Sequence, residues 1–429
     1  MAACLVVAAL LGCGCEDPPP GLDLSDDPTR YIEQIEYRRG VLQRDLIGRE
    51  TTYAQKRLEL YGLADEGWEL LPERDRPSRR LSVEDTDRLQ EGSLDDIDVS
   101  DLRPVMPETV PDDGEEWIAL GREVVARYPL RSDPMYTVLA SMPGALERAG
   151  FLTRPDGTWV GLAVFQDEDG STRIGPTCAQ CHCSPTEYGQ PSPVVANKGM
   201  DLGAANLLVL GYDPDERPEG IEGRPAEVHY DLGPGRADVL ADGVFNPLAF
   251  PDLGGLADMP YLQQNANWIH GGLATLAIRC ETLFTTSNLD RTRIPRALSW
   301  AAASFYRSWN APTPLDANPG PDAAEGEAVF EDAGCAECHT PPTYTSDRLV
   351  SLEEVGTDPA AGTSPARGTG YYRIPSLRGV GRTAPYLHHG AVRTLEEMLS
   401  PEREEPGHEF GMDLSEEERS QLIAFLRSI

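Results

Sequence analysis

The segments Cys178-Ala-Gln-Cys-His182 and Cys335-Ala-Glu-Cys-His339 are two copies of one Cys-x-x-Cys-His motif. Each copy sits inside a longer repeat of five segments that match in the same chain order. The other matched pairs are Gly121–Val125 with Gly326–Phe330, Pro251–Leu256 with Pro375–Val380, Pro260–Leu262 with Pro385–Leu387, and His270–Leu276 with His389–Leu395. Because the order is conserved and each copy closes on a helical pattern, the sequence predicts two related units.

In an exported protein, Cys-x-x-Cys-His is the attachment signature of c-type haem. Its two thiols are spaced to reach both vinyl groups, and its imidazole is placed to bind the iron from one face. A structural zinc site or disulfides are the alternatives, but zinc needs four ligands close together and these motifs lie far apart. We therefore expect two covalently bound c-type haems, one on Cys178, Cys181 and His182 and one on Cys335, Cys338 and His339.

The second axial ligand is expected from the loop ahead of each closing helix. In unit two that loop is Pro406-Gly-His-Glu-Phe-Gly-Met412, so His408 is the first candidate. Met412, Met398 and His388 are alternatives. A loop histidine with no role at iron is the other reading of His408, although histidine is a frequent metal ligand.

Unit one has no equivalent, because residues 271–334 contain neither histidine nor methionine. The first iron therefore either stays open or takes a ligand from elsewhere; the candidates are His270, His229, Met259 and Met200. An open iron binds peroxide or oxygen, whereas a six-coordinate iron mostly passes electrons.

An insertion in unit one, Gln263–Ile269, has no counterpart in unit two and is expected to line the distal side of the first haem. Trp268 would gate that pocket or carry an electron, and Gln264 is the nearest polar candidate for catalysis. The simpler reading of Trp268, that it packs in the core, has equal weight.

The amino terminus and the cysteines bear on the compartment. Cys4–Leu11 is an apolar run too short to span a bilayer but typical of a signal-peptide core, and it leads into Leu10-Leu-Gly-Cys13, which resembles a lipobox. We expect an exported lipoprotein on the periplasmic side or the cell surface, anchored by lipid on Cys13; a frayed apolar start is the alternative. Of nine cysteines, Cys183 and Cys280 would make a plausible disulfide, although a sequence cannot establish the pairing.

Net charge excludes some partners. Asp and Glu number 71 against 37 Lys and Arg, giving a formal charge of -34. Such an acidic surface repels nucleic acid and offers no basic patch for anionic lipid. The expected partners are a redox protein or a small-molecule oxidant, with membrane contact only through the lipid anchor.

Periodicity divides the chain into four parts. Residues 1–12 are the expected signal peptide, and residues 13–114 a tether, a helical extension from Thr29 to Tyr61 and a loop or linker from 72 to 114. Residues 115–312 form the first haem domain, with helices from Glu115 and over Pro295–Trp309 and short strands around Trp159–Val164. Residues 313–429 form the second, which ends on a helix opened by a capping box at Ser415–Glu418.

Unit two resembles the C-terminal domain of dihaem cytochrome c peroxidases and rubber oxygenases through Ala384–Gly390 and Gly407–Gly411. Gly235–Val239 and Phe245–Leu253 are similar to the first domain of the rubber-oxygenase branch. The resemblance covers residues 115–429 and implies a mostly α fold: two cytochrome c-like haem domains in tandem with long loops and a few short strands, plus an N-terminal helical extension. It also implies that His408 is the distal ligand, that His388 lies near a propionate, and that the first haem is the reactive one.

Two functions remain open at this level. The first is a dihaem oxidoreductase that reacts with peroxide or dioxygen at the first haem while the second, ligated by His339 and His408, relays electrons. The second is a non-catalytic, lipid-anchored electron carrier with two six-coordinate haems. The carrier needs a distal ligand on the first iron, most simply His270, so the coordination of that iron separates the two.

Overall fold

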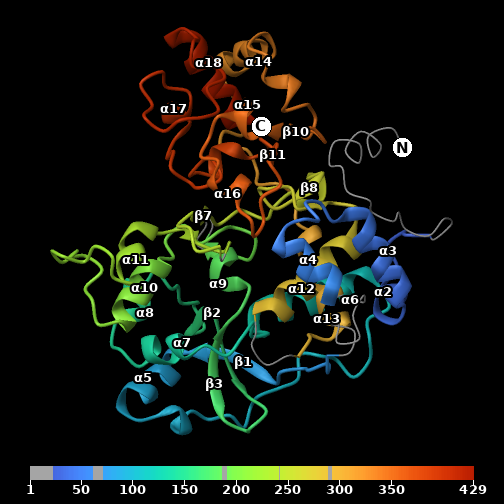
Figure 1. Ribbon diagram of the computed structural model, residues 1–429, viewed down its shortest axis with the longest axis vertical. Coiled ribbons are helices and arrows are strands. Elements are labelled where there is room, and N and C mark those ends of the chain that lie inside the picture. The colour runs from blue at the N-terminus through green and yellow to red at the C-terminus, as the bar shows by residue number, and fades with distance from the viewer. Residues whose placement is uncertain (1–22, 61–70, 186–190, 241, 288–291) are drawn as a thin grey trace.

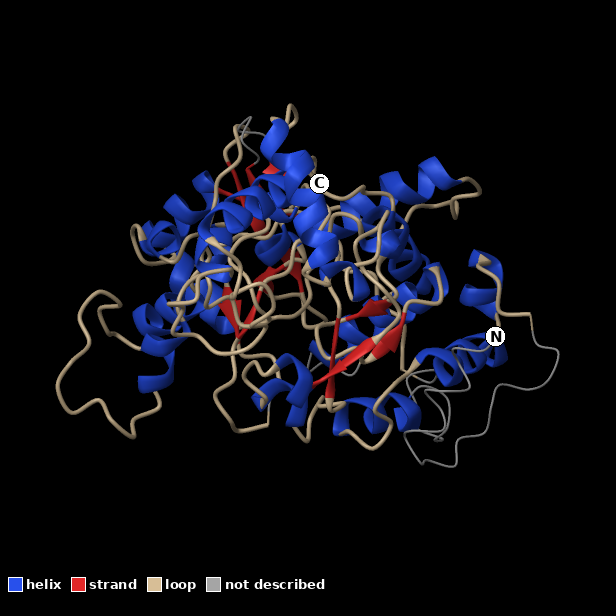
Figure 2. Cartoon of the chain, turned by 90° about the horizontal axis from the view of Figure 1, so that it is seen from above, coloured by secondary structure: helices blue, strands red, loops and turns tan. Residues whose placement is uncertain are grey.

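The computed structural model describes residues 23–60, 71–185, 191–240, 242–287 and 292–429. Within these ranges the chain is mainly helical, with long loops, one three-stranded sheet and four two-stranded ladders. Figure 2 shows the strands as short pieces among helices and loops. No helix of the described part is long and apolar enough to cross a bilayer. The expected signal run and lipid site, Cys4–Leu11 and Cys13, lie outside the described residues.

The N-terminal extension folds as three short helices, α2 (Pro28–Glu33), α3 (Ile35–Asp45) and α4 (Thr52–Leu60). The sequence predicts one helical pattern here, but the backbone is extended at Gln34 and Leu46, where two of the helices end. The helices pack on unit one: Tyr31 is fully buried, with its ring centroid 5.4 Å from that of Trp300. Figure 1 shows these blue helices beside α12 and α13. The extension is therefore part of the core.

The expected linker at 72–114 is wrong in its central part. It contains β1 (Ser78–Ser82), α5 (Val83–Glu91) and the 3-10 turn η2 (Leu94–Asp96), and β1 pairs antiparallel with β2 of unit one. This strand, Ser-Arg-Arg-Leu-Ser, has two charged residues in five, so a hydrophobicity pattern does not predict it. Arg79 offsets its charge through Asp85 and Asp101, at 2.5 and 2.8 Å, while Leu81 is fully buried.

Unit one carries the larger core. Its helices are α6 (Gly114–Arg127), α7 (Pro134–Ala140), α8 (Ala145–Arg148), α9 (Ala179–His182), α10 (Leu202–Val209), α11 (Glu227–Leu232), η3 (Leu256–Asp258), α12 (Leu273–Ser287) and α13 (Arg296–Arg307). Its strands are β2 (Thr158–Gln166), β3 (Thr172–Pro176), β4 (Ser184–Pro185), β5 (Pro191–Ser192), β6 (Arg236–Ala237), β7 (Leu248–Ala249), β8 (Tyr261–Leu262) and β9 (Trp268–Ile269). The predicted helices at 115 and 295–309, and the strand at 159–164, are confirmed by α6, α13 and β2.

Unit two lies at the top of Figure 1, in orange and red. Its elements are α14 (Pro321–Asp332), η4 (Cys335–Glu337), β10 (Leu349–Ser351), α15 (Leu352–Val355), α16 (Ala360–Thr363), β11 (Tyr371–Arg373), η5 (Val380–Arg382), α17 (Leu395–Met398) and α18 (Glu416–Ser428). The predicted capping box is present, since the Ser415 hydroxyl and the Glu418 carboxylate each accept from the other's backbone N–H. The loop before α14 contains no helix.

Each unit contains a pair of helices that cross in the same way. In unit one, α6 packs on α13 at Gly121; in unit two, α14 packs on α18 at Gly326. A Cβ added to Gly121 would lie 2.0 Å from the Ala301 carbonyl oxygen, and one added to Gly326 would lie 2.0 Å from that of Gln421. Only glycine allows backbones to approach so closely. The glycines matched in the sequence repeat thus occupy equivalent structural positions.

Candidate functional site

The first Cys-x-x-Cys-His segment forms α9 and its N-terminal boundary, held against β2. The Thr177 N–H donates to the Gly161 carbonyl at 2.8 Å, and the Tyr136 hydroxyl donates to the Gln180 side chain at 3.0 Å. Gly161 has φ +80°, and a Cβ there would lie 2.2 Å from the Cα of Gln180. The central strand β2 therefore packs directly against the motif, and a residue larger than glycine would not fit at Gly161.

The two motif histidines are prepared in the same way. His182 Nδ1 donates to the Pro251 carbonyl at 3.1 Å, and His339 Nδ1 donates to those of Tyr344 and Pro375, both at 3.1 Å. Pro251 and Pro375 are matched positions of the repeat. A carbonyl that accepts a hydrogen bond from Nδ1–H keeps the proton on that nitrogen. The other nitrogen of the neutral ring is then unprotonated and can bind a metal.

Burial keeps both rings neutral. It lowers the pKa of His182 to about 4 against the opposing effect of the Pro251 carbonyl, and the charges of Lys198 and Arg279 lower it further. Burial likewise lowers the pKa of His339. A neutral imidazole is the form that binds metal.

His408 faces His339 across a space of the right size for one metal ion. Their ring centroids are 6.3 Å apart, with 58° between the ring planes. Two imidazoles that each bind a metal at ~2 Å bring their ring centres to ~6 Å. The Nδ1 atom of His408 is buried without a hydrogen-bond partner among the described residues, and its backbone has φ +49°. A strained residue with an unpartnered nitrogen is typical of a ligand position.

The other candidates in unit two have different partners. The guanidinium of Arg403 lies 3.5 Å from the Met412 sulfur and 3.7 Å from the Met398 sulfur. His388 stacks on Tyr372, with ring centroids 4.6 Å apart. Of the two histidine candidates in unit two, only His408 has a ring contact with His339 among the described residues.

Unit one has no such pair. No histidine ring among the described residues faces His182 as His408 faces His339. His270 Nδ1 donates to the Met259 carbonyl at 2.9 Å. Burial lowers the pKa of His270 and the charge of Arg307 lowers it further, whereas the Met259 carbonyl, Asp45 and Asp26 oppose this shift. Its Nε2 atom is buried without a hydrogen-bond partner in the described part of the chain.

Three candidates for the first iron remain, of which Met259 is buried and supplies the carbonyl that accepts from His270 Nδ1. Met200 is fully buried in the hydrophobic cluster around the three-stranded sheet. His229 lies half-buried on α11, where burial lowers its pKa. Neither has a polar or ring contact with His182 among the described residues.

The insertion at 263–269 joins three parts of the chain. The Asn267 amide donates to the Arg367 carbonyl of unit two at 2.8 Å, and the Asn267 carbonyl accepts from Ile47 of the extension at 2.8 Å. The Gln264 carbonyl accepts from the Arg373 N–H at 3.0 Å, and its side-chain amide donates to the Ala249 carbonyl at 3.5 Å. Gln264 thus lies where the two units meet.

Trp268 is fully buried in the main core, and its Nε1 donates to the Tyr53 hydroxyl at 2.8 Å. Trp268 therefore packs in the core, one of the two roles that the sequence left open. It also forms a hydrogen bond with Tyr53 of the N-terminal extension. Catalytic roles for Trp268 and Gln264 remain predictions. Sequence patterns missed Tyr53, because the resemblance begins at residue 115.

The structure does not join Cys183 to Cys280, the pairing that the sequence left open. The Cys183 sulfur faces Arg154, whose Nη2 is 3.9 Å away. Cys280, on α12, lies instead beside Cys178 and Tyr306, and burial together with these thiols raises the pKa of Tyr306 well above its ordinary value. The helix α12 points Cys280 toward the first motif, a direction that sequence spacing does not show.

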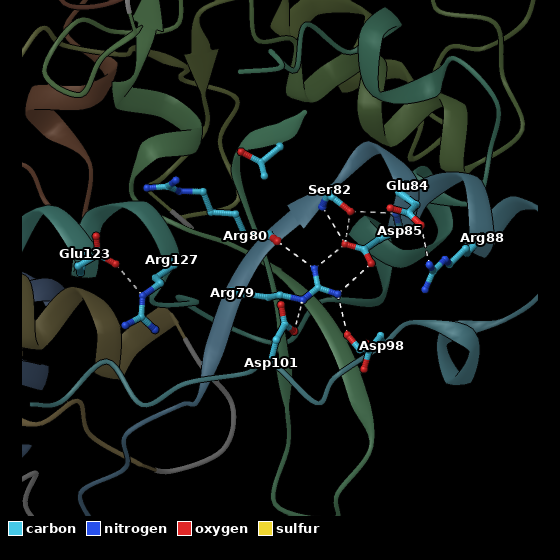
Figure 3. Close-up of a pocket in the computed structure, with 11 residues that line it drawn as sticks. Arg79, Arg80, Ser82, Glu84, Asp85, Arg88, Asp98, Asp101, Glu123 and Arg127 are labelled. Atoms are coloured by element: carbon cyan, nitrogen blue, oxygen red, sulfur yellow. Dashed lines mark hydrogen bonds and ion pairs between the residues drawn. The ribbon is translucent and has the colours of Figure 1, made fainter. Parts of the chain in front are cut away.

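A cavity of about 500 Å³ lies away from both motifs (Figure 3). It is lined by residues of β1, α5, α6, the start of β2 and the segment between η2 and α6. Arg79 lies between Asp85, Asp98 and Asp101, and Arg88 pairs with Glu84 at 2.5 Å. Its charges are paired among themselves and no motif residue lines it, so we assign it a structural role.

Two Cys-x-x-Cys-His segments, each with a neutral histidine held through Nδ1, define the class of a c-type cytochrome. A family model described as RoxA-like, cytochrome c-like, matches residues 370–406. The cytochrome c551 peroxidase of Nitrosomonas europaea is 30% identical over 120 residues, 25% of this chain and 34% of the peroxidase. The MauG protein of Methylorubrum extorquens is 33% identical over 123 residues, 26% of this chain and 35% of that protein.

The MauG protein of Methylophilus methylotrophus aligns over 307 residues, at 28% identity, covering 63% of this chain and 81% of that protein. Among solved structures, hydrazine synthase of Kuenenia stuttgartiensis matches 48% of this chain and 80% of that chain at 18% identity and a TM-score of 0.33. The alignments span about a third of the first two relatives. The matches confirm the resemblance to the dihaem cytochrome c peroxidase superfamily, and they show covalently bound c-type haem as the cofactor.

Proposed function

We propose that the chain is an exported dihaem oxidoreductase that reduces peroxide or activates dioxygen at the Cys178–His182 site, with the Cys335–His339 site relaying electrons. When bound, c-type haem supplies the redox chemistry: an iron with an open position reacts with oxidants, and one closed by two histidines passes electrons. In this proposal the two units are tandem cytochrome c-like domains, and the lipid-bearing Cys13 holds the protein at a membrane.

The observation that carries the proposal is the asymmetry between the two histidines. His339 has a partner ring at 6.3 Å, whereas no described histidine ring faces His182. The residues of unit two hold both faces of the metal position with neutral imidazoles. In this proposal His182 would hold one face of a bound iron in unit one, and the other face would be open to the substrate.

The polar residues of unit one have defined tasks in this proposal. The Pro251 carbonyl orients His182 and keeps the proton on Nδ1. The buried wall of Trp268 and Tyr53 excludes bulk water from this part of the core. Gln264, at the meeting of the two units, is the proposed polar group for the substrate.

Electron paramagnetic resonance of the oxidised, haem-loaded protein tests the asymmetry. We expect one high-spin and one low-spin ferric signal, together with peroxide or oxygen turnover. His408→Ala should convert the low-spin signal to high-spin, whereas Met412→Leu, the matched control in the same loop, should leave it unchanged. Two low-spin signals in the wild type, with a high-spin signal appearing only in His270→Ala, would establish the electron-carrier alternative.

A further inference from the structure

Three arginines from three different parts of the chain converge on one buried phenol. Arg57 comes from α4 of the extension, Arg279 from α12 of unit one and Arg367 from the loop after α16 of unit two. The guanidinium carbon of Arg57 lies 3.4 Å from the Tyr53 ring centroid, and that of Arg367 lies 4.9 Å from it. We call Arg57, Arg279 and Arg367 the arginine cluster.

The arginine cluster has only neutral partners. Arg57 donates to the Thr282 hydroxyl at 3.3 Å and to the Tyr53 carbonyl at 2.8 Å. Arg279 donates through Nε and Nη2 to the Gln263 side-chain oxygen, both at 3.1 Å, when that amide is turned so that its nitrogen meets Asn267. Among the described residues, no carboxylate forms an ion pair with any of the three.

Two other arginines of this acidic chain do pair with carboxylates. Arg296 meets Glu281 at 3.3 Å, and Arg79 meets Asp85 at 2.5 Å. Three like charges collected without an anion in a low-dielectric interior repel one another. Burial is the main cause that lowers the pKa of Arg57 to about 10; Tyr53 opposes it, and the charges of Arg279 and Arg367 lower the pKa further. The cluster is therefore built to receive negative charge.

The arginine cluster surrounds Tyr53, which belongs to the same hydrophobic cluster as the motif residue Ala179, and Cys178 packs against that cluster. Arg279 directly precedes Cys280, which lies beside the haem-attachment residue Cys178. The charge of Arg279 also reaches His182, where it adds to the effect of burial in lowering the pKa of the ring. An anion bound by the arginine cluster would therefore lie next to the cofactor of unit one.

We propose that Arg57, Arg279 and Arg367 form a carboxylate-binding site for the propionates of the haem attached at Cys178 and Cys181. Propionates are the carboxylates that the cofactor carries, and guanidinium groups bind carboxylates in paired, charge-assisted hydrogen bonds. The N-terminal extension and unit two thereby become parts of the first haem pocket. The inference rests on the attached cofactor and not on the oxidoreductase reaction proposed above.

The test uses the haem-loaded protein and the matched pair Arg57→Gln and Lys56→Gln. Both remove one positive charge from α4, but Lys56 is exposed. With haem content equal by pyridine haemochrome assay, Arg57→Gln and Arg367→Gln should each lower the reduction potential of the first haem, because an uncompensated propionate favours the ferric state. We expect a roughly tenfold change in the redox equilibrium, which is about 59 mV for one electron. Lys56→Gln should leave the potential unchanged, and Arg57→Lys should restore part of it.

A second measurement does not depend on the arginine variants. With no anion present, burial would raise the pKa of the Tyr53 phenol, but Arg57, Arg279 and Arg367 outweigh it and lower that pKa to about 8. Propionates seated on the arginines cancel this effect, so a 13C-tyrosine titration of the haem-loaded protein should show no phenol ionising near pH 8 that Tyr53→Phe removes. The proposal is overturned if the Tyr53 phenol ionises near pH 8 in the haem-loaded protein. It is also overturned if Arg57→Gln and Arg367→Gln have the same reduction potential as Lys56→Gln. A potential that responds to added formate would show that the cluster takes a soluble carboxylate instead, which also overturns it.

Discussion

The glycine crossings of the two units predict how each unit responds to one added methyl group. Gly326→Ala would place a Cβ 2.0 Å from the Gln421 oxygen and 2.9 Å from the Phe425 Cβ, and Gly121→Ala would place one 2.0 Å from the Ala301 oxygen. Overpacking costs about 1–3 kcal/mol or more, and alanine recovers ~1 kcal/mol of helix propensity. Since backbone oxygens in a helix cannot move aside, we expect a cost of ~3 kcal/mol, at the upper end of that range, and therefore a net loss of ~2 kcal/mol for each.

Denaturant unfolding of the haem-loaded protein measures this loss, followed separately through the absorption of each haem. Gly326→Ala should lower the midpoint of the transition reported by the second haem, and Gly121→Ala that of the first. Gly114→Ala is the matched control in α6, because no atom lies within 4 Å of its added Cβ. Midpoints for Gly121→Ala and Gly326→Ala equal to that of Gly114→Ala would refute the close packing of both helix pairs.

Two further predictions concern pH and the contact between the units. Burial, with the charge of His389, lowers the pKa of His388 to about 4, against an ordinary value of 6.5. The folded state thus favours the neutral ring, so up to ~3 kcal/mol of stability present above pH 6.5 is lost as the pH falls toward 4. His388→Gln should flatten that part of the pH–stability curve in urea unfolding, and an unchanged slope would exclude His388 as its source. At the contact between units, Asn265→Ala removes a buried amide that donates to the Ala361 carbonyl at 2.6 Å, at a cost of ~1–3 kcal/mol. Arg378→Gln breaks only a half-exposed ion pair with Asp258, at a cost below ~1 kcal/mol, and the reverse order of urea midpoints would contradict this account.

Sequence patterns predicted the features that repeat. The matched Gly121 and Gly326, the two Cys-x-x-Cys-His segments and the choice of His408 follow from comparing one half of the chain with the other. The same comparison showed that unit one lacks a ligand equivalent to His408. The structure adds the facing rings of His339 and His408 and the common proline carbonyl behind both motif histidines.

Features without a repeat were not predictable in this way. The strand β1 is short and charged, and one of its two arginines, Arg79, is neutralised by Asp85 and Asp101, which come later in the chain. Cys280 turned out to lie beside Cys178, because the direction in which a helix presents one thiol depends on how that helix packs. The arginine cluster draws on three distant segments, and no local pattern connects Arg57 with Arg367.

The insertion at 263–269 fastens the N-terminal extension, unit one and unit two to one another through its backbone and its asparagines. These bonds oppose rotation of one unit relative to the other. In the proposed relay, the separation between the two cofactors is then a constant of the fold, and electron passage between them would not wait for a domain movement. A change in solvent viscosity should accordingly leave the rate of electron exchange between the units unaltered.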